Sequence, residues 1–258
     1  MLANYHGHTR RCRHAFGTER EYIERAIAGG YKEFGFSDHA PQVWPEGYDS
    51  GMRMFLYQLP EYIQCITDLK KEYEKDIKIF LGFETEYYPN YFSKLMEEFS
   101  NYPEIDYMIL GQHFLYDEIN APASGAQTDS VVLLKQYVKQ TSEALKTGLF
   151  SCFAHPDIMN FIGDENIYYE EMKKICLVAK KYDVPLEINF LGLMDDRQYP
   201  NPKFWEIAGE VKNKVIFGAD CHNPESVVNP LAEERALKIV DKFKLDHIEF
   251  LKMKELAF

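Results

Sequence analysis

Cysteine is scarce in this chain, and its spacing rules out several kinds of site. The five cysteines are odd in number, and no two are separated by only two residues. This pattern is typical neither of a disulfide framework nor of a cysteine-rich zinc motif. A reducing, cytoplasmic compartment is therefore expected. Cys12 and Cys221 lie inside histidine-containing motifs, where a small space-filling role is favoured over metal ligation.

Long apolar runs and clusters of basic residues are also missing. No run is long enough to cross a bilayer, and the first residues lack the pattern of a secretory signal. The 29 Lys and Arg residues face 41 Asp and Glu residues, for a net charge of -12. Because no basic stripe follows the chain, nucleic acid is not expected as a partner. A small phosphorylated metabolite fits if metal ions and a few arginines supply positive charge.

The common nucleophile and nucleotide-binding motifs are absent as well. We find no GxSxG, Walker or GxGxxG pattern, so neither a serine hydrolase nor a standard nucleotide loop is expected. There is no internal repeat, low-complexity tract or linker. The 258 residues, 46% of them hydrophobic, fit a single domain spanning residues 1–258. The sequence does not indicate an oligomeric state.

Short apolar runs alternate with helical patterns along the whole chain. This alternation predicts an α/β fold in which parallel strands form a closed or nearly closed barrel. Thr18 and Glu21 have the spacing of a capping box at the start of one helix. The seven expected strands are Leu2–His6, Glu33–Ser37, Ile77–Glu84, Tyr107–Gln112, Leu149–Ala154, Leu186–Phe190 and Val215–Ala219.

Nearly all the histidine in the chain stands at the ends of these strands, together with two carboxylates. Chemistry collects at the carboxyl ends of the strands in α/β barrels, so these side chains are expected to meet. Imidazole and carboxylate suit Zn, Mn or Fe. Nine ligands are too many for one ion and leave two or three divalent metals open. The candidate ligands are His6, His8, His14, His39, Glu84, His113, His155, Asp220 and His222.

Clustered divalent ions activate water and stabilise the charge of a phosphoryl group, so phosphoester hydrolysis is the expected reaction. Arg197 and Arg53 are the best candidates to hold the phosphate, and Arg13 is a third, each against the alternative of a surface ion pair. Asp157 is a candidate general acid. Asp38 is expected either to orient an imidazole or to cap a helix. Glu86 is expected to be a hydrogen-bonded loop residue rather than a spare ligand.

The motifs HGHT, FSDHAP, GFETEYYP, QHF, AHPD, LEIN and GADCH, in this order, resemble the PHP (polymerase and histidinol phosphatase) superfamily, in its histidinol-phosphatase branch. The resemblance covers almost the whole chain and implies a distorted (β/α)7 barrel with a trinuclear metal centre. It implies one metal on His6, His8, Glu84 and Asp220, a second on Glu84, His113 and His155, and a third on His14, His39 and His222.

The same resemblance implies hydrolysis of L-histidinol phosphate to L-histidinol and phosphate, a step of histidine biosynthesis, by attack of a metal-activated hydroxide on phosphorus. Trp44, Tyr48 and Tyr116 are candidate contacts for the histidinol part. Two alternatives stay open. One is a phosphoesterase for nucleotides or other small phosphomonoesters, and the other is a non-catalytic metal-binding module.

Overall fold

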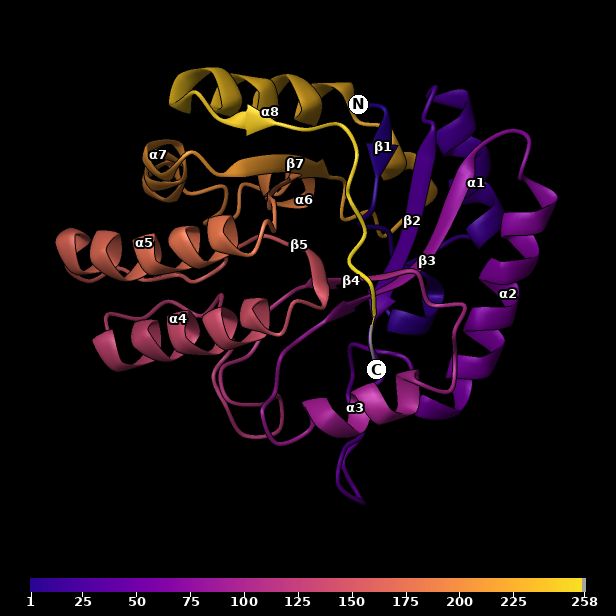
Figure 1. The fold of residues 1–258 in the computed structure, drawn as a ribbon, viewed down its shortest axis with the longest axis horizontal. Coiled ribbons are helices and arrows are strands. Elements are labelled where there is room, and N and C mark those ends of the chain that lie inside the picture. Colours follow the sequence, from indigo (N-terminus) through magenta and orange to yellow (C-terminus); the bar gives the residue numbers. More distant parts are fainter. Residues whose placement is uncertain (257–258) are drawn as a thin grey trace.

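The computed structural model describes residues 1–256, which form one curved parallel sheet with helices on its outer side (Figure 1). Within that range the sheet has eight strands, and their spatial order follows the sequence order from β1 to β8. The strands are β1 (Ala3–Asn4), β2 (Glu33–His39), β3 (Lys78–Thr85), β4 (Tyr107–Leu110), β5 (Phe150–Phe153), β6 (Leu186–Asn189), β7 (Lys214–Gly218) and β8 (Asp246–His247).

The sheet curls into an incomplete barrel whose first and seventh strands meet only at one end. Beyond β1 and β7, Gly7 and Cys221 form an isolated parallel bridge, in which His8 N–H donates to Cys221 O at 3.0 Å. At the other end β8 pairs with the start of β7 instead. The predicted α/β barrel is therefore confirmed in class. The sequence reading missed the eighth strand because two residues carry no alternation to detect.

The helix start predicted at Thr18 is confirmed, and most other helices also begin at a capping side chain. The Thr18–Glu21 capping box forms, and Ser130, Asp164 and Asn201 accept backbone N–H groups at their own helix starts. The helices are α1 (Glu19–Ala28), α2 (Leu59–Glu72), α3 (Phe92–Phe99), α4 (Val131–Lys146), α5 (Glu165–Lys181), α6 (Phe190–Met194), α7 (Pro202–Val211) and α8 (Pro230–Phe243), with 3-10 turns at Arg10–Cys12, Leu56–Gln58 and Pro224–Val227.

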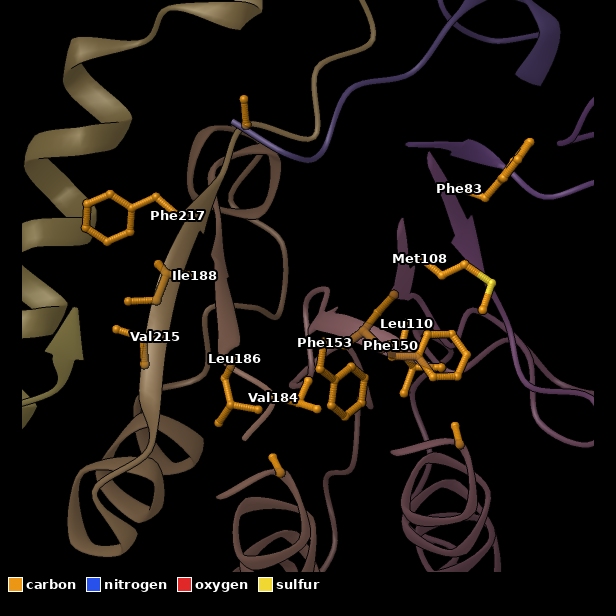
Figure 2. Close-up of a cluster of buried hydrophobic side chains, with 14 of the residues drawn as sticks. Phe83, Met108, Leu110, Phe150, Phe153, Val184, Leu186, Ile188, Val215 and Phe217 are labelled. Atoms are coloured by element: carbon orange, nitrogen blue, oxygen red, sulfur yellow. The ribbon is translucent and has the colours of Figure 1, made fainter. Parts of the chain in front are cut away.

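Alternation along each strand divides the core into two layers. Leu81 and Phe83 of β3 belong to the large outer cluster under the helices, whereas Phe80 belongs to a smaller inner cluster. Figure 2 shows the outer layer continuing through strands β4 to β7, with Phe153 and Leu186 on neighbouring strands. The inner positions nearer the carboxyl ends are polar, and Glu84 and Glu187 are among them. The same alternation that builds the core thus aims these carboxylates into the barrel.

The C-terminal segment closes the opposite, amino-terminal side of the inner layer. After β8 the chain runs across the sheet, as the yellow trace in Figure 1 shows. Leu251 packs into the inner cluster, and Lys254 N–H donates to Ser151 Oγ at 2.9 Å. This leaves the carboxyl ends of the strands as the open face. Within residues 1–256, no helix combines the length and the apolar character that a bilayer crossing requires.

Candidate metal centre

All nine predicted ligands lie at the carboxyl end of the barrel, and we call them the ligand cluster. His6 and His8 follow β1, His39 ends β2, and Glu84 lies in the last part of β3. His113 follows β4, His155 follows β5, and Asp220 and His222 follow β7, while His14 comes from the loop after the first 3-10 turn. The cluster therefore draws on every strand end from β1 to β7 except that of β6.

Two members of the ligand cluster have left-handed backbone conformations. His155 has φ 32° and Asp220 has φ 48°, and each stands two residues beyond the end of its strand. For residues other than glycine this conformation costs about 1–3 kcal/mol and concentrates at functional sites. The turn sends both side chains back toward the barrel axis instead of onward along the strand.

Glu84 is the centre of the cluster. Its carboxylate oxygens lie 2.9 Å from His39 Nδ1, 2.9 Å from His155 Nε2 and 3.4 Å from His113 Nε2. Gly111 makes room for this carboxylate, since a Cβ built there would stand 1.9 Å from Glu84 Oε1. A single buried carboxylate that faces imidazoles from both sides is suited to bridge two cations.

Asp220 provides the second acidic centre, next to the histidines of the first strand. Its Oδ1 lies 3.0 Å from His8 Nε2 and 3.4 Å from His6 Nε2. The imidazole of His222 stacks on that of His8, with ring centroids 4.1 Å apart, and on that of His14, at 4.7 Å. The pairing of Gly7 with Cys221 brings these residues together, as the sequence reading expected for adjacent first and last strands.

Each of four imidazoles in the cluster has a polar contact at Nδ1, which leaves its Nε2 available to bind a metal ion. Nδ1 of His6 lies 2.8 Å from Glu187 Oε1, and Nδ1 of His113 lies 2.9 Å from Glu86 Oε1. Nδ1 of His14 and of His222 face the backbone oxygens of Cys12 and Asp220, at 2.7 and 3.0 Å. An Nδ1–H that donates in this way fixes the tautomer with an Nε2 lone pair, the arrangement typical of metal-binding histidine.

Several buried polar atoms of the cluster make no hydrogen bond of good geometry within the protein, although other imidazole and carboxylate atoms lie close to them. They include Nε2 of His6, His8 and His222, and Oε2 of Glu84. Leaving such atoms unsatisfied is costly, and native proteins rarely do so. A divalent cation would satisfy these lone pairs together, so the donor set fits a metal.

The charge balance of the cluster also fits a bound cation. Burial alone would raise the pKa values of Glu84 and Asp220, but the surrounding imidazoles hold both well below their usual range. Burial lowers the pKa of His39 to about 4 and that of His222 to about 3, which keeps both neutral at pH 7. Burial would also lower the pKa values of His6, His8 and His113, but the neighbouring carboxylates raise them, that of His8 to about 9. Positive charge on these imidazoles balances the carboxylates, and a bound cation would take over that role.

The grouping of ligand atoms supports more than one ion. His14, His39 and His222 bring one ligand atom each within 4.8 Å of one another, and so do His6, His8 and Glu84. The first group is the whole of the predicted third site. The second group is the predicted first site without Asp220. The predicted second site, on Glu84, His113 and His155, has its three side chains in contact through Glu84 Oε1. The buried clusters are consistent with a multinuclear metal site.

A cavity of about 430 Å³ opens directly above the ligand cluster. Seven members of the cluster form its floor. Its remaining lining is a set of side chains from loops and from α6 that we call the loop wall. The loop wall consists of Met52, Ile158, Leu191, Arg197 and Tyr199. Arg197 is the single arginine or lysine lining the cavity in the part of the chain that is described, and it also contacts Tyr199 Oη at 3.2 Å. Sequence reasoning found Arg197 but missed the other four.

Arg53 does not occupy the place that the sequence reading gave it. Its side chain is 1% exposed, and it does not line the cavity above the ligand cluster. Its guanidinium donates to Glu86, to Glu118 and to the carbonyl of Ala40 instead. This arrangement does not support phosphate binding by Arg53. Arg13 pairs with Asp49 and Ser50 O at the surface, the alternative that the sequence reading favoured.

Asp38 and Asp157, predicted to orient an imidazole and to act as general acid, lie behind the cluster rather than in the cavity above it. Asp38 accepts N–H from His39 at 2.9 Å, and its Oδ1 lies 3.6 Å from His8 Nδ1. This position suits the expected orienting role, toward His8. Asp157 is 1% exposed and accepts Asn201 N–H at 2.5 Å. Burial raises its pKa to about 7, but it does not line the cavity, so its placement does not support direct proton donation to a substrate.

The aromatic residues predicted to receive the substrate lie away from the cavity floor. Trp44 and Tyr48 line a separate hollow of about 190 Å³ with Arg53, and Tyr48 Oη donates to Glu118 at 3.0 Å. Tyr116 is 48% exposed. The structure brings none of the three to the lining of the larger cavity. Glu187 of the LEIN motif orients His6, a role that the sequence did not predict.

Comparison with known proteins agrees with this geometry. The family model described as PHP domain matches residues 4–190. A protein of Deinococcus radiodurans named "Probable histidinol-phosphatase" is 31% identical over 234 residues, which covers 88% of each chain. A protein of Shewanella frigidimarina named "Probable phosphatase" is 25% identical over 251 residues, 93% of this chain and 84% of that one.

One crystal structure shares the fold along nearly the whole chain. Histidinol phosphate phosphatase from Lactococcus lactis, solved in complex with zinc, L-histidinol and phosphate, superposes with a TM-score of 0.71. It is 21% identical, and the match covers 96% of this chain and 95% of that one. The chain belongs to the PHP domain family. It is a PHP-family phosphoesterase with a buried cluster of side chains whose chemistry suits metal ions.

Proposed function

We infer that this protein is a metal-dependent phosphomonoesterase that hydrolyses L-histidinol phosphate to L-histidinol and phosphate. The observation that carries the proposal is the convergence of nine imidazole and carboxylate side chains at the open end of the barrel, seven of them on the floor of one cavity. The names of the relatives and the ligands of the Lactococcus lactis structure support the choice of substrate. The substrate class is a small phosphorylated metabolite.

The ligand cluster would hold two or three divalent ions of Zn, Mn or Fe. One would be bound by His6, His8, Glu84 and Asp220, a second by Glu84, His113 and His155, and a third by His14, His39 and His222. Bound divalent ions supply an activated water and stabilise the charge that develops on the phosphoryl oxygens. The role of the protein side chains is then to fix these ions and to orient the substrate above them.

Arg197 is the side chain that would orient the phosphate. It lines the cavity, and its guanidinium can bind two phosphoryl oxygens in a planar fork. Met52, Ile158 and Leu191 would pack against the part of the substrate that leaves. A cavity of about 430 Å³ is in the range of small-molecule sites, and an apolar wall excludes water from the reacting centre.

A phosphate-release assay on metal-loaded protein tests the proposal. The substrates to compare are histidinol phosphate, a panel of nucleotides and a generic phosphomonoester, with the metal content of the same sample measured in parallel. We expect the highest kcat/KM for histidinol phosphate. A higher value for a nucleotide would replace the proposed substrate within the same enzyme class. Inactivity of metal-loaded protein on every phosphoester would favour a non-catalytic metal-binding module.

A further inference from the structure

A buried chain of ionic contacts leads from one ligand of the cluster to a loop outside it. Glu86 is 0% exposed, and its Oε1 lies 2.9 Å from His113 Nδ1. The guanidinium of Arg53 grips the same carboxylate with two bonds, from Nη1 at 2.8 Å and from Nη2 at 2.9 Å. The order of contacts is therefore Arg53, Glu86, His113 and then Glu84 at the centre of the cluster.

Arg53 has no donor left for any other purpose. Its five N–H groups are matched by five contacts, because Nε and Nη2 also donate to Glu118 and Nη1 also donates to Ala40 O. Removing a buried arginine from such a set would strand two carboxylates, which is strongly unfavourable. The residue is thus committed to holding Glu86 and Glu118 in place.

His6 offers a comparison within the same cluster. Its Nδ1 also faces a buried carboxylate, Glu187, but the bonds that hold Glu187 come from His155 N–H and from Asn189. These residues lie at strand ends, so the sheet itself fixes the orientation of His6. The orientation of His113 depends instead on the guanidinium of Arg53, which comes from the loop between β2 and α2 and holds Glu86.

We propose that Arg53 and Glu86 are positioning residues that fix the tautomer and the direction of His113, and so set the affinity of the ion that His113 binds. This inference rests on the proposed metal role of His113. Glu86 accepts the Nδ1–H, which leaves the Nε2 lone pair directed at the ion shared with Glu84. Arg53 holds both oxygens of that carboxylate. Outer partners of this kind typically change metal affinity by about 10- to 100-fold.

The test is a zinc titration of chelator-treated protein against a competing chelator, with the number of ions and each dissociation constant measured. The variants are Glu86→Gln, Arg53→Lys and the control Glu118→Gln. Glu118 contacts the same guanidinium but does not reach His113, so the control disturbs Arg53 without breaking the chain to the ligand. Thermal unfolding of the zinc-free variants checks that each one folds.

We expect Glu86→Gln to raise the dissociation constant of one zinc ion by about 10- to 100-fold. The dissociation constants of the other ions should stay within about threefold of the wild-type values. Arg53→Lys keeps the charge but loses the fork, so a smaller loss at the same ion is expected. Glu118→Gln should lower the unfolding temperature without changing zinc affinity. Equal losses in all three variants, or no loss in Glu86→Gln, would overturn the inference.

The wild-type protein separates this inference from the proposed function. If the wild type binds no zinc, the metal centre is wrong and the inference falls with it. If it binds zinc but releases no phosphate from histidinol phosphate, the proposed substrate is wrong, and the zinc constants of the variants still decide the role of Arg53 and Glu86.

Discussion

The ligand cluster and the loop wall face each other across one cavity, but they are built in different ways. The cluster stands on the ends of paired strands, and Glu84 and His8 have side chains that are at most 1% exposed. The loop wall comes from the segments after β2, β5 and β6, and the side chain of Arg197 is 43% exposed. Strand ends are fixed by the sheet and loops are not, so substitutions in the loop wall are expected to disturb the cluster less than substitutions at the strand ends.

Metal removal is expected to have the largest effect, since it acts on the cluster as a whole. Treatment with a chelator should abolish phosphate release and lower Tm by roughly 5–10 °C relative to protein at a hundredfold excess over Kd. That range follows from about 2.7 kcal/mol of ligand stabilisation and about 2–4 °C per kcal/mol. Added Zn or Mn should restore both. Full activity in a sample shown to be metal-free would contradict the role of the cluster.

Asp220→Asn should reduce kcat more than about 100-fold, because it removes one of the two carboxylates at the centre of the cluster. Asparagine tolerates the left-handed backbone at this position, so unfolding should stay cooperative. Asp183→Asn is the matched control, since Asp183 is also left-handed, at φ 51°, but lies at the surface. Wild-type turnover in an Asp220→Asn protein of low metal content would refute the assignment.

Gly111→Ala should lower kcat by about 10- to 100-fold through displacement of Glu84. The new methyl group would lie 1.9 Å from Glu84 Oε1, so the carboxylate has to move away from His155 and His113. Misplacement of about 1 Å at a reacting centre carries a cost of this order. Gly51→Ala, where a Cβ meets nothing within 4 Å, is the control for steady-state kinetics. Equal kinetics of the two variants would count against a central role for Glu84.

Arg197→Ala tests the loop wall and should have the smallest effect, a rise in KM of about 10-fold with kcat less affected. This corresponds to about 1.4 kcal/mol, near the lower end for a hydrogen bond to a charged group, because the side chain is partly solvated. Arg197→Lys should show a smaller rise in KM. The control variant Arg20→Ala, which removes a surface ion pair, should keep the wild-type KM. An unchanged KM in Arg197→Ala would remove this residue from the phosphate site.

Local sequence signals were reliable wherever one strand or one helix decides the structure. The Thr18–Glu21 capping box forms because it needs only four consecutive residues. The gathering of the candidate ligands was predicted from the same kind of signal, since a histidine at the end of an apolar run lies at the carboxyl edge of a parallel sheet. The prediction that Arg53 holds the phosphate is not supported, because the position of this side chain depends on residues far away in the sequence. Its partners Glu86 and Glu118 are 33 and 65 residues away, and no local pattern reports such a pairing.

The sequence by itself determined the fold class and the gathering of histidines and carboxylates at the open end of the barrel, because hydrophobic alternation and residue chemistry are properties of short segments. Only the tertiary structure decided which carboxylate stands behind which imidazole. It also decided that Met52, Ile158 and Leu191 share a wall with Arg197, and that Arg53 turns inward. Those choices depend on contacts between distant segments, whose geometry exists only once the sheet has curled and the loops have packed on it.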